Sequence, residues 1–204
     1  MTVHLHRGDL PPGLDLGPIV AVDSETMGLR PRRDRLCLVQ LSAGDGDAHL
    51  VKFDPGEGFD APNLVRLLGD PQVLKLFHFA RFDVAVFQAY LGVTTAPLYC
   101  TKIASKLVRT FTDRHGLKDL CRELIRVEVS KEKQSSDWGA AEIDEAQMSY
   151  AANDVLYLHR LKEVLDTMLA REGRTDLAGA AFAFLPSRAR LDLLGWDDTD
   201  IFAH

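Results

Sequence analysis

Three short apolar segments near the start of the chain constrain its fold more than any other feature. Ile19–Val22, Leu36–Leu41 and His49–Phe53 are separated by short stretches with turn residues, such as the Gly- and Asp-rich stretch 43–47. Strands joined so closely favour an antiparallel meander. Beyond residue 60, helical and extended patterns alternate, which places helices on the faces of a partly parallel sheet. We therefore predict an α/β fold with a mixed sheet of about five to six strands, antiparallel and then parallel, flanked by helices.

The later elements are predicted from their residue patterns. Helices are expected around Asn63–Leu68 and Phe82–Leu91, and strands at Val73–Phe77 and near Leu98–Cys100. The strongest helical pattern is Glu145–Arg171, where apolar residues recur at intervals of three and four. Asp144 and Gln147 resemble a capping box that begins this helix, and Gly173 would end it.

Length and composition indicate one domain over residues 1–204. With 204 residues and 46% hydrophobic content, the chain can bury a real core but leaves no room for a second large domain. The C-terminal segment, about 182–204, is unusually apolar for a chain end. We expect it to pack on the domain or at a subunit interface, which favours a homo-oligomer.

Location is predicted from what the sequence lacks. The first ten residues show no apolar leader, and no stretch approaches eighteen apolar residues, so we expect a cytoplasmic protein without a membrane partner. Cys37, Cys100 and Cys121 are widely spaced among apolar neighbours, which is typical of reduced core thiols.

Charge is distributed unevenly along the chain. The net charge is −6, which argues against a protein that coats long nucleic acid through a broad basic field. Residues 102–133, however, hold nine basic and five acidic side chains and so carry a local charge of +4. Solvated helix faces would explain this, or a wall that faces phosphate beside an acidic site.

Five residues carry the predicted chemistry. Asp23 and Glu25 lie two apart at the end of the first predicted strand, so their carboxylates point to one face. Asp83 opens a predicted helix, and Tyr150 and Asp154 share one face of the long helix through their i to i+4 spacing. Taken singly, these residues also suit a turn, a helix terminus or a core aromatic. Four carboxylates in one pocket would repel one another without cations, and two-metal phosphodiester hydrolysis requires such a set. Oxygen ligands select Mg²⁺ or Mn²⁺.

The order Asp-x-Glu, then Phe-Asp at a helix start, then Tyr-x3-Asp resembles the DEDDy exonucleases of the ribonuclease D group. Residues 115–120 (HGLKDL) and 131–138 (KEKQSSDW) also resemble the Gly-Leu-x-x-Leu and Gln-x-Ser-Asp-Trp stretches of that group. Within it, the stretch CTKIASKL and the ending LDLLGW…DIFAH are similar to the short nano-RNase C branch. The resemblance runs nearly end to end. It implies a ribonuclease H-like fold, a 3′→5′ exonuclease domain, and removal of nucleotides from very short RNA, especially dinucleotides, by a ring-shaped homo-oligomer.

The resemblance also implies roles for the five residues. Asp23 bridges two divalent cations, Glu25 and Asp154 hold the cation on the side of the nucleophile, and Asp83 supports the other. Tyr150 positions the attacking water, since a phenol with a pKa near 10 is a poor base at neutral pH. The products would be nucleoside 5′-monophosphates.

Ten further residues are candidates for substrate binding. Each has a structural alternative: Leu29 wedges between bases or packs after a turn, Phe79 and Trp138 stack on bases or pack, and Gln134, Ser135 and Ser136 contact substrate or cap a helix. His78 replaces an Asn that is usual in the wider group, and it contacts sugar or phosphate or is a buried histidine. Lys106, Arg109 and Arg114 grip a 5′ phosphate or are surface charges.

Two rival functions remain. A DNA-trimming or structured-RNA-processing 3′→5′ exonuclease would use the same metal site, and the sequence does not separate RNA from DNA. A non-catalytic RNA-binding scaffold is the rival from another class, but such degenerate domains usually lose a metal carboxylate, and all four are present.

Overall fold

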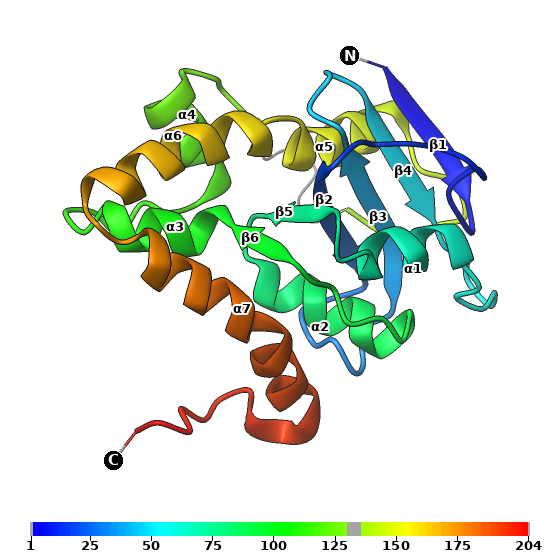
Figure 1. Cartoon of the computed structure of the whole chain (residues 1–204). Coiled ribbons are helices and arrows are strands. Elements are labelled where there is room, and N and C mark those ends of the chain that lie inside the picture. Colours follow the sequence, from blue (N-terminus) through cyan, green and yellow to red (C-terminus); the bar gives the residue numbers. More distant parts are fainter. Residues whose placement is uncertain (1, 130–135, 204) are drawn as a thin grey trace.

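The computed structural model describes residues 2–129 and 136–203 and shows a six-stranded mixed sheet flanked by helices (Figure 1). The strand order is β1-β4-β3-β2-β5-β6. The strands are β1 Val3–Arg7, β2 Ile19–Thr26, β3 Leu36–Ser42, β4 Ala48–Lys52, β5 Leu74–Phe77 and β6 Leu98–Cys100. Strands β2, β3 and β4 form the predicted antiparallel meander, and β5 and β6 extend the sheet in parallel from β2.

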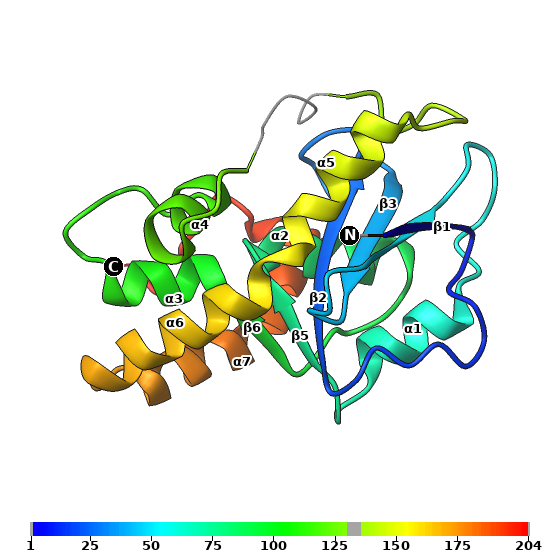
Figure 2. The same cartoon turned by 90° about the horizontal axis from the view of Figure 1, so that it is seen from above.

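Seven α-helices pack around this sheet in the described residues. They are α1 Pro62–Gly69, α2 Ala80–Tyr90, α3 Thr101–Val108, α4 Leu117–Ile125, α5 Glu145–Leu156, α6 Leu158–Arg171 and α7 Thr175–Leu191. Helix α5 lies across β2, β3 and β4 on one face, while α1 and α2 cover the opposite face (Figures 1 and 2). Strands and helices share one large core, and β3 is buried along its whole length. Among the described helices, none is both long and apolar enough to cross a membrane.

Two of the sequence predictions need correction. The single helix expected at Glu145–Arg171 is two helices, because α5 ends at Leu156 and α6 begins at Leu158, with Tyr157 at φ −108° and ψ −3° between them. The apolar spacing continues through this residue, so the pattern hides the break. The capping box of Asp144 and Gln147 is confirmed, and Gly173 follows the end of α6 with a positive φ.

The second correction is strand β1, which the sequence analysis missed. Val3–Arg7 alternates apolar and polar residues and is only partly buried, so it resembles a solvated terminus. It pairs in parallel with β4 at the sheet edge. Strand β2 also extends to Thr26, four residues beyond the predicted apolar run, and this extension carries two of the predicted carboxylates within the strand.

The C-terminal segment packs only in part on the rest of the chain. Helix α7 lies against α2 and buries Phe182, Leu185 and Ala189. After α7, the chain kinks within Asp192–Trp196, where Gly195 has a φ of 100°, and leads into an exposed end that extends away from the sheet (Figure 1). Arg81 of α2 donates to Asp192 at 2.6 Å and so fixes the start of this segment.

Candidate active site

A pocket of about 670 Å³ opens at the end of the sheet where β2 finishes. Helix α5 forms one wall, and the beginning of α2, on the opposite face of the sheet, forms another. The pocket is lined by all five predicted catalytic residues, Asp23, Glu25, Asp83, Tyr150 and Asp154. Sheet and helices therefore bring together side chains that are up to 131 positions apart in the chain.

Strand β2 and helix α5 provide a tight group of three carboxylates. Asp23 and Glu25 alternate with Ser24 on β2, so both face α5. Asp154 lies two residues before the end of α5, one helical turn after Tyr150. One carboxylate oxygen from each of Asp23, Glu25 and Asp154 lies within 4.8 Å of the other two. This grouping is the one expected of ligands to a shared cation.

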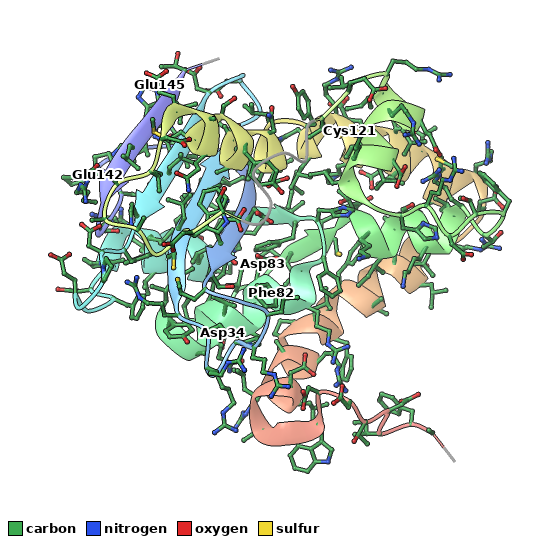
Figure 3. The ribbon with its side chains drawn as sticks, turned by 180° about the vertical axis from the view of Figure 1, so that it is seen from behind. Asp34, Phe82, Asp83, Cys121, Glu142 and Glu145 are labelled. Atoms are coloured by element: carbon green, nitrogen blue, oxygen red, sulfur yellow. The ribbon has the colours of Figure 1, made fainter. Side chains whose placement is uncertain are left out.

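Asp83 reaches the same pocket from the other face of the sheet. It lies in the first turn of α2, close to the end of β2 (Figure 3). Ser24 donates a 2.6 Å hydrogen bond to Asp83 Oδ1, and both side chains are buried. Asp83 lies outside the group of three carboxylates that share a 4.8 Å sphere, which agrees with a supporting position rather than a central one.

The electrostatics of the pocket favour cation binding. Burial, and then the neighbouring carboxylates, raise the pKa of Asp23 well above its usual value and that of Glu25 to about 9. Burial raises the pKa of Asp83 and of Asp154 to about 7. A divalent cation would favour the charged forms and remove this repulsion. The donor set, carboxylate oxygens alone, suits Mg²⁺ or Mn²⁺.

Tyr150 lies beside these carboxylates with its ring 6.1 Å from the ring of Trp138. Burial and the charges of Asp154 and Glu25 raise the pKa of its phenol far above neutral pH. In the metal-free site the phenol therefore holds its proton and can donate a hydrogen bond. Trp138 is itself buried, and it packs behind Tyr150 as well as lining the pocket.

The loop after β2 places Leu29 over the pocket. Leu29 is 85% exposed although it lines the cavity. The loop is held by Asp34, which accepts from the Arg30 backbone N–H at 2.9 Å and from Arg33. A Cβ on Gly28 would lie 2.3 Å from the Asp34 carboxylate, so the loop needs glycine there. Leu29 is thus an exposed apolar side chain at the pocket. The alternative prediction, a packed core residue after a turn, is wrong.

A second wall is formed where β5 leads into α2. His78 and Phe79 both line the pocket, and Phe79 is 47% exposed with left-handed φ of 74° and ψ of 42°. The Lys102 ammonium lies 4.3 Å from the centre of the Phe79 ring. This wall therefore combines an aromatic face, a cation and an imidazole.

The three predicted phosphate-binding cations do not line the pocket. Arg109 is only 2% exposed, where it pairs with Glu123 and donates to the Arg114 carbonyl at 2.7 Å. Its expected role as a surface phosphate ligand is wrong, because the sequence cannot show that this cation is committed internally. Lys106 and Arg114 are exposed away from the described pocket lining.

Sequence reasoning missed two lysines that do line the pocket. Lys102 is the second residue of α3 and Lys118 the second residue of α4, and both had been counted only as part of the basic segment. The sequence did offer a signal for both lysines, because Lys102 lies in the stretch CTKIASKL and Lys118 in the stretch HGLKDL, and both stretches resemble the family. Ser136 lines the pocket as expected, whereas Gln134 and Ser135 lie outside the described residues. Cys37, Cys100 and Cys121 are buried free thiols, as expected.

Comparisons with known proteins agree with this geometry. A family model described as a 3′–5′ exonuclease matches residues 13–170. The solved structure of Brucella melitensis NrnC with bound Mg²⁺, a nano-RNase C, is 55% identical with a TM-score of 0.95 and covers 100% of both chains. The same protein bound to pGG is 56% identical with a TM-score of 0.95, covering 100% of this chain and 99% of that chain.

A curated relative is more distant and longer. Ribonuclease D of Gluconacetobacter diazotrophicus is 37% identical over 172 residues, which cover 84% of this chain but 43% of that protein. The chain thus spans less than half of the curated relatives it matches first.

The fold is ribonuclease H-like, and its site of four carboxylates and a tyrosine defines a DEDDy 3′–5′ exonuclease. The chain belongs to the 3′–5′ exonuclease family, within its ribonuclease D-type members. The solved structure of Brucella melitensis NrnC, which matches this chain over its full length, contains Mg²⁺.

Proposed function

We propose that this chain hydrolyses very short RNA from the 3′ end, dinucleotides above all, and releases nucleoside 5′-monophosphates. The observation that carries the proposal is the group of Asp23, Glu25 and Asp154 within 4.8 Å, in a pocket of about 670 Å³. This volume lies in the range that suits small ligands. Similarity over the full length to a protein solved with pGG supports the same substrate class.

We assign two divalent cations, Mg²⁺ or Mn²⁺, to the carboxylates. Asp23, Glu25 and Asp154 would hold them, with Asp83 as a further ligand. When bound, such cations would neutralise charge on the scissile phosphate. They would also lower the pKa of bound water, so that hydroxide is available as the nucleophile at neutral pH. The residues' own contribution is to hold this site at the end of a rigid sheet, where Ser24 fixes the orientation of Asp83.

Tyr150 is proposed to orient the attacking water. Its phenol remains protonated and lies beside Asp154 and Glu25, so it can donate a hydrogen bond into the site. Its orientation is restricted by the ring of Trp138 behind it.

The remaining walls are proposed to bind the substrate's bases and phosphates. Leu29 would separate two neighbouring bases, and Phe79 offers an exposed ring for stacking. Lys102 and Lys118 are the cations placed to meet phosphate. The net charge of −6 over the whole chain argues against an extended basic track, which favours a substrate of few nucleotides.

We further propose that residues 1–204 act as one exonuclease domain that assembles into a homo-oligomer, with a ring as the arrangement to test. Support comes from a cluster of exposed apolar side chains near the C-terminus: Phe184, Leu194, Trp196, Ile201 and Phe202. We place the activity in the cytoplasm, where short RNA fragments arise and where three unpaired thiols are stable.

A length series tests the proposal. RNA and DNA oligomers of two to about ten nucleotides, labelled at the 5′ end, are incubated with the protein in Mg²⁺, and kcat/KM is measured for each. We expect the highest value for the RNA dinucleotide. Equal rates on long or structured RNA, or on DNA, would favour the trimming or processing exonuclease instead. Binding without any cleavage would favour a scaffold.

A further inference from the structure

His78 is held by one side of its ring. Its Nδ1 lies 2.9 Å from Thr101 Oγ1, and Thr101 Oγ1 lies 3.1 Å from the carbonyl oxygen of Phe77. Thr101 is completely buried. These three groups form a short chain of hydrogen bonds at the junction of β5, α2 and α3.

This chain determines which nitrogen of His78 carries the proton. The Thr101 hydroxyl has one hydrogen, and the carbonyl of Phe77 can only accept. If Thr101 donated to His78, its oxygen would face the Phe77 carbonyl without a proton between them. The satisfied arrangement has Thr101 donate to Phe77 and accept from Nδ1–H of His78. The ring's remaining nitrogen, Nε2, is then unprotonated.

Because Nδ1 is turned to the buried Thr101, Nε2 is the ring nitrogen left for a ligand. His78 lines the pocket, and its Nε2 has no hydrogen-bond partner within residues 2–129 and 136–203. Burial, and then the charge of Lys102, lower the pKa of His78 to about 3, so the imidazole is neutral across the physiological range. His78 therefore presents a lone pair, not a proton, to the substrate.

A lone pair cannot bind phosphate oxygen, which is also an acceptor, but it suits the hydroxyl group of a sugar. The neighbouring Lys102 is the group placed to meet phosphate. We propose that Nε2 of His78 accepts a hydrogen bond from a ribose hydroxyl of the substrate, and that Thr101 is the positioning residue that keeps this nitrogen unprotonated. The inference rests on the proposed function and adds to it a residue that recognises the sugar.

A cycle of enzyme variants and substrate deletions tests the contact. His78→Leu removes the acceptor, and His78→Gln keeps an acceptor oxygen near the position of Nε2. Each enzyme is assayed on the RNA dinucleotide and on three dinucleotides that lack one hydroxyl: the terminal 3′-hydroxyl, the 2′-hydroxyl of the 3′ nucleotide, or that of the 5′ nucleotide.

We expect His78→Leu to lower kcat/KM on the full RNA dinucleotide about 3- to 10-fold, the value of one neutral hydrogen bond. On the one substrate that lacks the contacted hydroxyl, His78→Leu should change kcat/KM little. The substrate that shows this small effect identifies the hydroxyl. His78→Gln should recover most of the loss. An equal loss on all four substrates would overturn the inference. No cleavage of the dinucleotide by the unaltered protein would instead reject the proposed function.

A second measurement does not depend on activity. Nitrogen-15 NMR of labelled histidine in the unaltered protein should show His78 protonated at Nδ1 and unprotonated at Nε2. Thr101→Val, which keeps the shape but removes the hydroxyl, should shift the tautomer towards a mixture. A proton on Nε2 in the unaltered protein would contradict the assignment directly.

Discussion

Ser24 donates its hydroxyl hydrogen to Oδ1 of Asp83 at 2.6 Å, and this buried bond joins strand β2 to helix α2 across the active site. Its two flanking residues, Asp23 and Glu25, are the proposed metal ligands and lie on the other face of the same strand. One strand thus contributes two carboxylates to the site and fixes the orientation of a third.

Ser24→Ala should therefore weaken metal binding while the fold persists. Loss of a hydrogen-bonding partner of a ligand typically costs about 10- to 100-fold in metal affinity or activity. The measurement is the Mg²⁺ concentration that gives half-maximal activity. Ser42→Ala is the matched control, because Ser42 is also a buried serine but bonds to Asp47 at the turn between β3 and β4. Similar Mg²⁺ requirements for both variants would count against the Ser24–Asp83 relationship.

Removal of Mg²⁺ should expose the repulsion among the carboxylates. Because folding raises the pKa of Glu25 from 4.5 to about 9, the metal-free fold is favoured at low pH, and this contribution is lost as pH rises through about 9. In EDTA, the melting temperature should be lower at about pH 8.5 than at about pH 6.

Added Mg²⁺ should raise the melting temperature more at the higher pH, because it binds the deprotonated carboxylates. Thermal melts at both pH values, with and without Mg²⁺, give the comparison. A gain from Mg²⁺ that is the same at both pH values would show that the carboxylates do not carry raised pKa values.

Leu29→Ala should reduce activity without loss of stability. Leu29 is 85% exposed, so its removal costs the fold little, but it should lose apolar contact with substrate bases worth about 10-fold in kcat/KM. Leu177→Ala is the control, since Leu177 is also exposed, at 58%, but lies on α7 outside the pocket lining. If the two variants had equal kcat/KM on the dinucleotide, Leu29 would have no role in binding.

Arg109→Ala should show the opposite behaviour. Its side chain is buried against Glu123 and the Arg114 carbonyl, so the loss should cost about 2 kcal/mol in the free energy of unfolding. Arg114→Ala removes a side chain that is 69% exposed and should change stability little. Urea denaturation measures both. If Arg109→Ala were as stable as the unaltered protein but bound 5′-phosphorylated substrate more weakly, the prediction would be contradicted. Arg109 would then be a phosphate ligand despite its burial.

The contrast between Leu29 and Arg109 shows which features can be predicted from sequence. Spacing along one element predicts a shared face, so the pairs Asp23 with Glu25 and Tyr150 with Asp154 were predictable. The side-chain type alone does not reveal burial. Arg109 and Lys102 are both basic residues of one segment, yet one is internal and the other lines the pocket.

The fold shows the same limits. The meander and the parallel strands follow from apolar runs and connection lengths, and the structure confirms them. Strand β1 was missed because an edge strand that alternates apolar and polar residues can pass for a solvated terminus. The break at Tyr157 was missed because apolar periodicity continues on both sides of it.

The central claim is that the carboxylate cluster hydrolyses short RNA with Mg²⁺, and Asp154→Asn on the dinucleotide pGG tests it most directly. The unaltered protein should release GMP in Mg²⁺, and the variant should be slower by at least about 100-fold, since loss of a ligand costs more than loss of a ligand's partner. In EDTA the variant should melt at a higher temperature than the unaltered protein, because one repelling charge is gone. Release of GMP by Asp154→Asn at the unaltered rate would contradict the account.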